Sequence, residues 1–136
     1  MSRYYSAGNN SAVLLIEDDT EAREVMAHTL EKSGWVVSEA SNGQKALDIM
    51  ETTLPQLILL DLMMPVMDGF GFLEAMRARP EWRHIPVIVV TAKDLTENDR
   101  ERLNGRVEEV LEKNAYSRED LLEHVREAIA ACNISR

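Results

Sequence analysis

The chain has 136 residues, 45% of them hydrophobic, and a formal net charge of −9 at pH 7, which indicates about one acidic domain with a core of its own. This charge argues against unaided binding to nucleic acid or to an anionic membrane, because both require positive charge. Its single cysteine, Cys132, excludes an internal disulfide, and no apolar stretch reaches the length of a membrane span, so we expect a cytoplasmic protein.

The first half of the chain alternates short apolar runs with amphipathic segments. Residues 12–16 form a run that is too short for a helix and suits a strand buried on both faces. A helix is predicted over 20–34, followed by a partly polar strand over 35–40. A second helix over 42–53 leads to a strand over 57–60. This strand is the most apolar of all and is therefore expected at the centre of the sheet.

The second half continues the alternation. A helix is predicted over 71–79, and a strand rich in β-branched residues follows over 86–91. The polar segment 96–104 predicts a fourth helix, and 106–112 a weak fifth strand. An amphipathic helix over 117–132 closes the chain.

Five strands alternating with five helices imply a parallel sheet with helices on both faces. We therefore predict one doubly wound α/β domain over residues 12–131, between an N-terminal arm (1–11) and a short tail (132–136). In such sheets ligands bind beyond the carboxyl ends of the strands. The residues that follow each strand are the candidates for a site.

Acidic, hydroxyl and ammonium side chains follow four of the predicted strands. In chain order they are Glu17, Asp18, Asp19, Asp61, Thr91 and Lys113. Carboxylates gathered at one sheet edge repel one another unless a cation lies between them, and Mg²⁺ accepts carboxylate and phosphate oxygens. Lys113 is a point charge suited to a phosphoryl oxygen, to which Thr91 can donate a hydrogen bond. The set predicts a metal-bridged phosphoryl site in which Asp61 is a candidate acceptor.

Each of these residues also has an ordinary structural explanation. Asp18 and Asp19 before a threonine are a common start of a helix. Asp68-Gly69 indicates a turn, and a threonine ending a strand or a surface lysine is usually structural. Asp61 at the end of an apolar strand is the hardest to explain in this way. The coincidence of all these groups at one edge favours the functional interpretation.

Four segments, "LLIEDD", "LILLDLMMPVMDG", "IPVIVVTA" and "VLEK", resemble in order and spacing the receiver domain of two-component response regulators. The resemblance covers nearly the whole chain. It implies a flavodoxin-like sheet with strand order 2-1-3-4-5. It also implies a phosphoacceptor signalling domain that catalyses its own phosphorylation and slow dephosphorylation but has no separate substrate.

The resemblance assigns roles to the metal-binding residues. Asp61 would be the phosphoacceptor, and Asp19 a direct ligand of Mg²⁺ or Mn²⁺. Asp18 would act on the metal mainly through water, and the backbone carbonyl of Met63 would complete the protein ligands.

The resemblance also implies the reaction partners. Thr91 and Lys113 would contact the phosphoryl oxygens. The phosphoryl group would come from a histidine kinase or a histidine phosphotransfer protein. The resulting change would alter docking to a downstream protein. From the acidic charge and the predicted elements, we expect no nucleic acid and no membrane as partners and no DNA-binding output domain. The chain would be a monomer or a weak homodimer.

Some positions depart from the usual receiver pattern. Asn114 follows Lys113 where receivers usually have proline, and Val110 stands where they usually carry an aromatic switch residue. A non-proline cis bond costs about 2.5–4 kcal/mol, so we expect the 113–114 bond to be trans. Met63 and Lys93 flank the expected path of an attacking water. Neither orients that water well, so slow self-dephosphorylation is predicted.

Other classes of protein fit less well. A haloacid-dehalogenase-type phosphatase needs a second aspartate two residues after the first, where this chain has Met63. A nucleotide or flavin binder requires a loop rich in glycine, serine or threonine after the first strand, where this chain has acidic residues. A receiver fold that binds partners without being phosphorylated is the main alternative.

Overall fold

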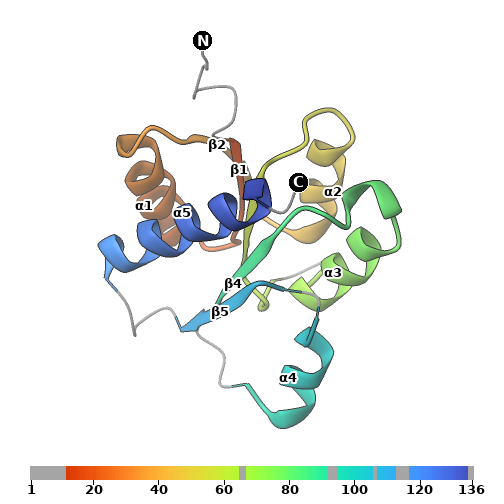
Figure 1. The fold of residues 1–136 in the computed structure, drawn as a ribbon. Helices are drawn as coiled ribbons and strands as arrows, with labels where there is room; N and C mark the ends of the chain where they lie inside the picture. The colour runs from red at the N-terminus through yellow and green to blue at the C-terminus, as the bar shows by residue number, and fades with distance from the viewer. Residues whose placement is uncertain (1–11, 65–66, 92–94, 106, 113–116, 135–136) are drawn as a thin grey trace.

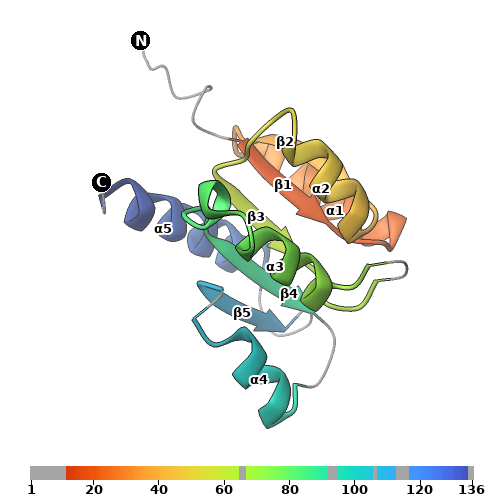
Figure 2. The ribbon, with the colours of Figure 1, turned by 90° about the vertical axis from the view of Figure 1, so that its right-hand side faces the viewer.

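The computed structural model describes residues 12–64, 67–91, 95–105, 107–112 and 117–134. The strands that it describes form one parallel sheet in the order β2-β1-β3-β4-β5 (Figure 2). Their bounds are β1 (Ala12–Ile16), β2 (Val36–Ala40), β3 (Leu57–Leu60), β4 (Val87–Thr91) and β5 (Glu109–Glu112). The predicted doubly wound sheet and its strand order are confirmed.

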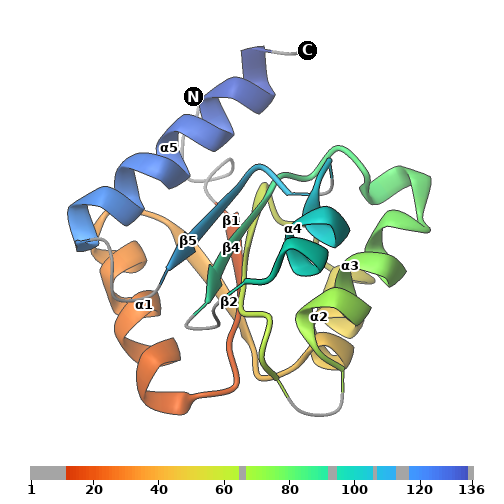
Figure 3. The ribbon, with the colours of Figure 1, turned by 90° about the horizontal axis from the view of Figure 1, so that it is seen from below.

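The helices lie on both faces of this sheet. Their bounds are α1 (Thr20–Lys32), α2 (Gly43–Met50), α3 (Gly69–Arg77), the 3-10 helix η2 (Pro80–Trp82), α4 (Glu97–Leu103) and α5 (Arg118–Ile134). Helices α1 and α5 cover one face, and α2, α3 and α4 cover the other (Figures 1 and 3). Right-handed crossovers between parallel strands place helices on both faces in this way.

The central strands are buried on both faces because successive side chains of a strand point in opposite directions. In β3 all four residues of Leu57–Leu60 are fully buried. Leu57 and Leu59 pack in the core shared with α1 and α5, whereas Ile58 and Leu60 pack in the core shared with α2, α3 and α4. The prediction that 57–60 is a central strand is confirmed, and its last residue leads directly into Asp61.

Most element boundaries differ from the prediction by one to three residues, and the starts of α3 and β5 are two of these differences. Helix α3 begins at Gly69 and not at residue 71, because the carboxylate of Asp68 accepts a hydrogen bond from the Gly71 amide (2.8 Å) and caps the helix. The Asp68-Gly69 pair is therefore a helix start and not a separate turn. Strand β5 begins at Glu109, so the predicted strand over 106–112 is shorter at its start.

Helix α4 is held by few buried side chains. Leu103 is its one buried apolar residue, as the sequence indicates, and Asp99 is buried through a capping box with Thr96. A further contact is not apparent in the sequence: the Arg102 guanidinium lies 4.0 Å from the centre of the Phe70 ring of α3. Such cation–π contacts are worth about 0.5–1 kcal/mol at exposed sites.

Candidate functional site

The backbone of Asp61 continues the sheet beyond the end of β3. Its amide donates a hydrogen bond to the Ile16 carbonyl at 3.0 Å, so the first residue after the strand is held in line with it. Asp61 is 5% exposed. Its carboxylate accepts a hydrogen bond from the Met63 amide at 3.2 Å. The acidic side chain is thus placed by rigid secondary structure and not by a free loop.

Glu17 occupies the equivalent position after β1. Ile16 pairs with Leu60 in the β1–β3 register, so the residues that follow each of them, Glu17 and Asp61, are neighbours at the sheet edge. Glu17 is 2% exposed, and its amide donates a hydrogen bond to the Ala40 carbonyl of β2 at 3.0 Å. Carboxylate oxygens of Glu17, Asp18 and Asp61 all lie within 4.8 Å of one another.

The negative charges of this carboxylate cluster (Glu17, Asp18 and Asp61) repel one another. Two ionised carboxylates at that separation repel by about 3 kcal/mol at an effective dielectric constant of 20. Oxygen-only donors around a small space are what Mg²⁺ and Mn²⁺ prefer. The residues present therefore fit a hard divalent cation, which would remove the repulsion.

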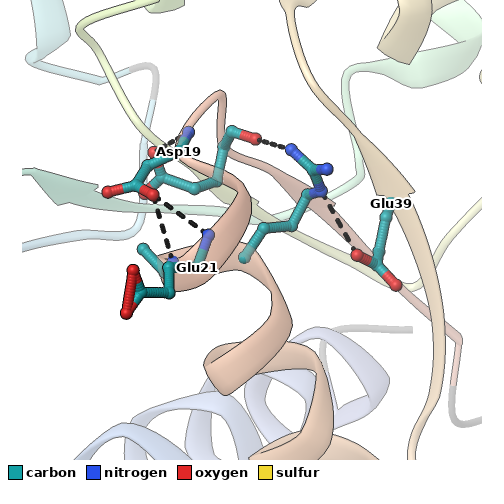
Figure 4. Close-up of polar contacts among 6 residues, drawn as sticks. Asp19, Glu21 and Glu39 are labelled. Carbon is teal, nitrogen blue, oxygen red and sulfur yellow. Dashed lines mark hydrogen bonds and ion pairs between the residues drawn. The ribbon is translucent and has the colours of Figure 1, made fainter.

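Asp19 is not part of the carboxylate cluster. Its carboxylate caps α1, accepting hydrogen bonds from the amides of Glu21 (3.0 Å) and Ala22 (3.4 Å), as Figure 4 shows. The ordinary structural explanation thus applies to Asp19. Glu17, for which the sequence predicts a place at the edge but no specific role, has a carboxylate oxygen within 4.8 Å of one of Asp61. The pairing of strand ends could have identified it, had the register been known.

The remaining predicted residues lie farther along the same edge or outside the described ranges. Thr91 is fully buried and is the last residue of β4, where it pairs with Glu112 of β5. Met63 is 58% exposed beside Asp61. Lys113 directly follows Glu112, but it lies outside the described residues, as do Lys93 and Asn114. Their predicted roles stay predictions.

A hollow on the surface lies beside Asp18 of the carboxylate cluster. Its volume is about 540 Å³, and its lining includes Asp18, Met63, Phe70 and Arg102. The hollow brings residues of α3 and α4 next to the ends of β1 and β3. Of the carboxylate cluster, Asp18 lines this hollow.

The sequence model of the response regulator receiver domain matches residues 13–126. The chain belongs to this family. Receiver domains are the phosphorylated modules of two-component systems, and they interact in general with histidine kinases or phosphotransfer proteins. In general they are not classical enzymes.

Individual relatives agree with this assignment. The receiver is 42% identical to the response regulator PleD of Caulobacter vibrioides over 85 residues, which are 62% of this chain and 19% of PleD. The signal receiver domain of a histidine kinase from Syntrophus aciditrophicus superposes with a TM-score of 0.80 at 28% identity, covering 89% of this chain and 91% of that one. A CheY-like receiver domain protein from Methanospirillum hungatei gives a TM-score of 0.82 at 26% identity, covering 93% and 98%.

The receiver spans about a fifth of the length of PleD. Among the described residues, the structure contains no helix with the length and apolar character that a membrane crossing requires.

Replacing Gly69 with alanine is expected to destabilise the receiver. A Cβ at this position would lie 2.7 Å from the Leu62 Cα and 2.8 Å from the Asp61 carbonyl oxygen, and backbone atoms cannot give way as a flexible side chain can. We expect the free energy of unfolding to fall by about 1–3 kcal/mol, measured by urea denaturation.

The matched control for this substitution is Gly71→Ala in the same helix. Its Cβ would lie 3.3 Å from the Met67 Cγ, and alanine favours the helix by up to about 1 kcal/mol. Equal losses of stability in the two variants would show that a Cβ at residue 69 does not clash with the backbone of Asp61 and Leu62.

Proposed function

We propose that the chain takes a phosphoryl group on Asp61 from a histidine kinase or a histidine phosphotransfer protein. The observation that carries this proposal is the nearly complete burial of Asp61 against two other carboxylates at the carboxyl end of β3. An aspartate that only caps a helix or forms a turn does not need two other carboxylates beside it. A phosphoryl acceptor that works with a divalent cation does need them, because the carboxylates together bind the cation.

The chemical step is a displacement at phosphorus. An oxygen of the Asp61 carboxylate bonds to the phosphorus of a phosphohistidine while the phosphorus–nitrogen bond breaks. The imidazole leaves with the electron pair of that bond and takes up a proton from solvent. Bound Mg²⁺ would neutralise charge on the phosphoryl oxygens. Glu17 and Asp18 would hold the cation together with Asp61.

Further residues would act on the phosphoryl group. Thr91, at the end of β4, would donate a hydrogen bond, and Lys113 would supply positive charge. The Met63 amide already binds the Asp61 carboxylate and so orients it. The Met63 carbonyl would be a further ligand of the metal. A cytoplasmic location, domain bounds of 12–131 and a monomeric or weakly dimeric state stay predictions.

The proposal is tested by incubating the protein with acetyl phosphate and Mg²⁺ and measuring its intact mass. We expect the addition of one phosphoryl group, its loss on hydroxylamine treatment, and no addition in the presence of a chelator. No addition with acetyl phosphate, with phosphorylated kinase or with phosphotransfer protein would favour a receiver fold that binds partners without being phosphorylated.

The phosphoryl group is expected to signal through α4 rather than through β5. Thr91 precedes the loop to α4, and that helix buries one apolar residue, so it can shift at low cost. Val110 is half-buried against the core and has too little volume to move into a vacated space. The coupling would therefore run through the backbone after β4.

Two alanine variants test this route. Thr91→Ala is expected to lose most of the phosphorylation-dependent change in amide exchange over 92–106 and the change in partner binding. Val110→Ala is expected to keep both. Amide exchange measured by mass spectrometry, with and without acetyl phosphate, provides the comparison. The reverse ranking of the two variants would identify β5 as the transmitter.

Self-dephosphorylation is expected to be slow and to accelerate in Met63→Asn. The exposed thioether of Met63 beside Asp61 cannot hydrogen-bond an attacking water well, whereas an amide can. The same effect is expected of Lys93→Glu. The decay of the phosphorylated mass after removal of the donor measures the rate. An unchanged rate in both variants would rule out this explanation.

A further inference from the structure

Arg23 of α1 connects three elements around the carboxylate cluster. Its Nη1 donates a hydrogen bond to the Glu17 carbonyl at 2.8 Å, and its Nε lies 3.2 Å from Oε1 of Glu39 on β2 (Figure 4). The Arg23 side chain is 17% exposed and that of Glu39 is 40% exposed. One guanidinium thus joins the first turns of α1, the end of β1 and the edge strand β2.

The contact reaches the cluster through its backbone. The Glu17 amide donates a hydrogen bond to the Ala40 carbonyl, and the Glu17 carbonyl accepts one from Arg23. The peptide groups on both sides of Glu17 are therefore held by hydrogen bonds. The Glu17 carboxylate in turn accepts a hydrogen bond from the Asp19 amide at 3.2 Å. The position of the Glu17 and Asp18 carboxylates relative to Asp61 therefore depends on where the guanidinium holds this backbone.

The ion pair alone does not account for this arrangement. A partly exposed ion pair such as Arg23–Glu39 is worth only about 0–1 kcal/mol. The planar guanidinium, however, offers donors in fixed directions, and a lysine ammonium at the end of a flexible stem cannot reproduce that fork. What Arg23 adds is geometry at the end of β1.

We propose that Arg23 is a positioning residue for the divalent cation, holding Glu17 and Asp18 at the spacing that cation binding requires. The inference rests on the proposed function only for its link to phosphorylation, because cation binding can be measured by itself. Groups around a metal site that orient its ligands are commonly worth about 10–100-fold in metal affinity. Since Arg23 acts through the backbone, the lower end of this range is expected.

The test measures the Mg²⁺ dissociation constant by isothermal titration calorimetry in the full chain. Arg23→Lys keeps the charge but loses the fork, and we expect its dissociation constant to rise by about tenfold. Arg23→Gln is expected to lose at least as much. Glu39→Gln removes only the ion pair with β2, and we expect a smaller rise in its dissociation constant. This variant replaces the Arg23 variants in the test if they fail to fold.

The matched control is Arg126→Lys, whose guanidinium pairs with Glu123 at 2.9 Å on the surface of α5. We expect wild-type Mg²⁺ affinity in this variant. A second readout is rescue: saturating Mg²⁺ should restore the rate of phosphorylation by acetyl phosphate in Arg23→Lys. Urea denaturation of Arg23→Lys separates this effect from lower stability, because a variant that is less stable but still folded should bind Mg²⁺ with wild-type affinity.

The outcomes separate the two proposals. Weaker Mg²⁺ binding in Arg23→Lys supports the positioning role even if the wild-type protein accepts no phosphoryl group. Unchanged Mg²⁺ affinity in Arg23→Lys overturns the positioning role. This holds even if Arg23→Gln binds Mg²⁺ less tightly, because a loss of affinity in the glutamine variant alone would mean that only the positive charge matters.

Discussion

Asp61→Asn is expected to reduce phosphorylation by acetyl phosphate below detection. Asparagine has nearly the same shape, and its side-chain oxygen can still accept the hydrogen bond from the Met63 amide. It lacks the negative charge and the nucleophilic carboxylate oxygen, so no acyl phosphate can form. Intact mass with and without the donor measures the effect.

The stability of this variant provides a second check. Removing one charge from three carboxylates within 4.8 Å relieves repulsion, so without Mg²⁺ we expect the melting temperature to rise or stay unchanged. The stabilisation that Mg²⁺ confers on the wild-type protein should shrink, because ligand-linked stability follows affinity.

Asp48→Asn is the control for Asp61→Asn. Asp48 is an exposed residue of α2, and its replacement should leave phosphorylation at the wild-type level. Phosphorylation that persists in Asp61→Asn would show that another residue accepts the phosphoryl group, and it would contradict the assignment of Asp61 as the acceptor.

Asp18→Asn and Glu17→Gln are expected to weaken Mg²⁺ binding strongly, whereas Asp19→Asn is not. Each of the first two removes one carboxylate from the cluster, and even groups outside the ligand shell are worth about 10–100-fold in metal affinity. Asparagine caps a helix as well as aspartate does, so Asp19→Asn keeps the start of α1 and leaves the cluster unchanged.

Calorimetric titration with Mg²⁺ decides between these acids. We expect the dissociation constant to rise by at least about tenfold in Asp18→Asn and in Glu17→Gln, with little change in Asp19→Asn. If Asp19→Asn loses as much affinity as Asp18→Asn while Glu17→Gln loses none, the metal ligands are those implied by the resemblance and not those of the cluster.

Periodicity carries most of the information that predicts the fold. A strand such as Leu57–Leu60 can bury the apolar side chains of both its faces only between two layers of helices. In the structure it is completely buried. The helix start at Gly69 was harder to predict, because Asp68-Gly69 is equally typical of a turn. The hydrogen bond from Gly71 to Asp68 decides it, and it depends on where the chain leaves β3.

The sequence by itself therefore determined the fold class, the strand order through the family resemblance, and Asp61 as the residue of interest, since a carboxylate after a fully apolar strand has few structural explanations. Only the tertiary structure decided which acids accompany it. The pairing of Ile16 with Leu60 sets Glu17 beside Asp61, while Asp19 turns into the first turn of α1. Contacts such as Arg23 with Glu17 and Arg102 with Phe70 join residues from different elements. Chain spacing cannot show them, because strand register and helix placement bring such side chains together.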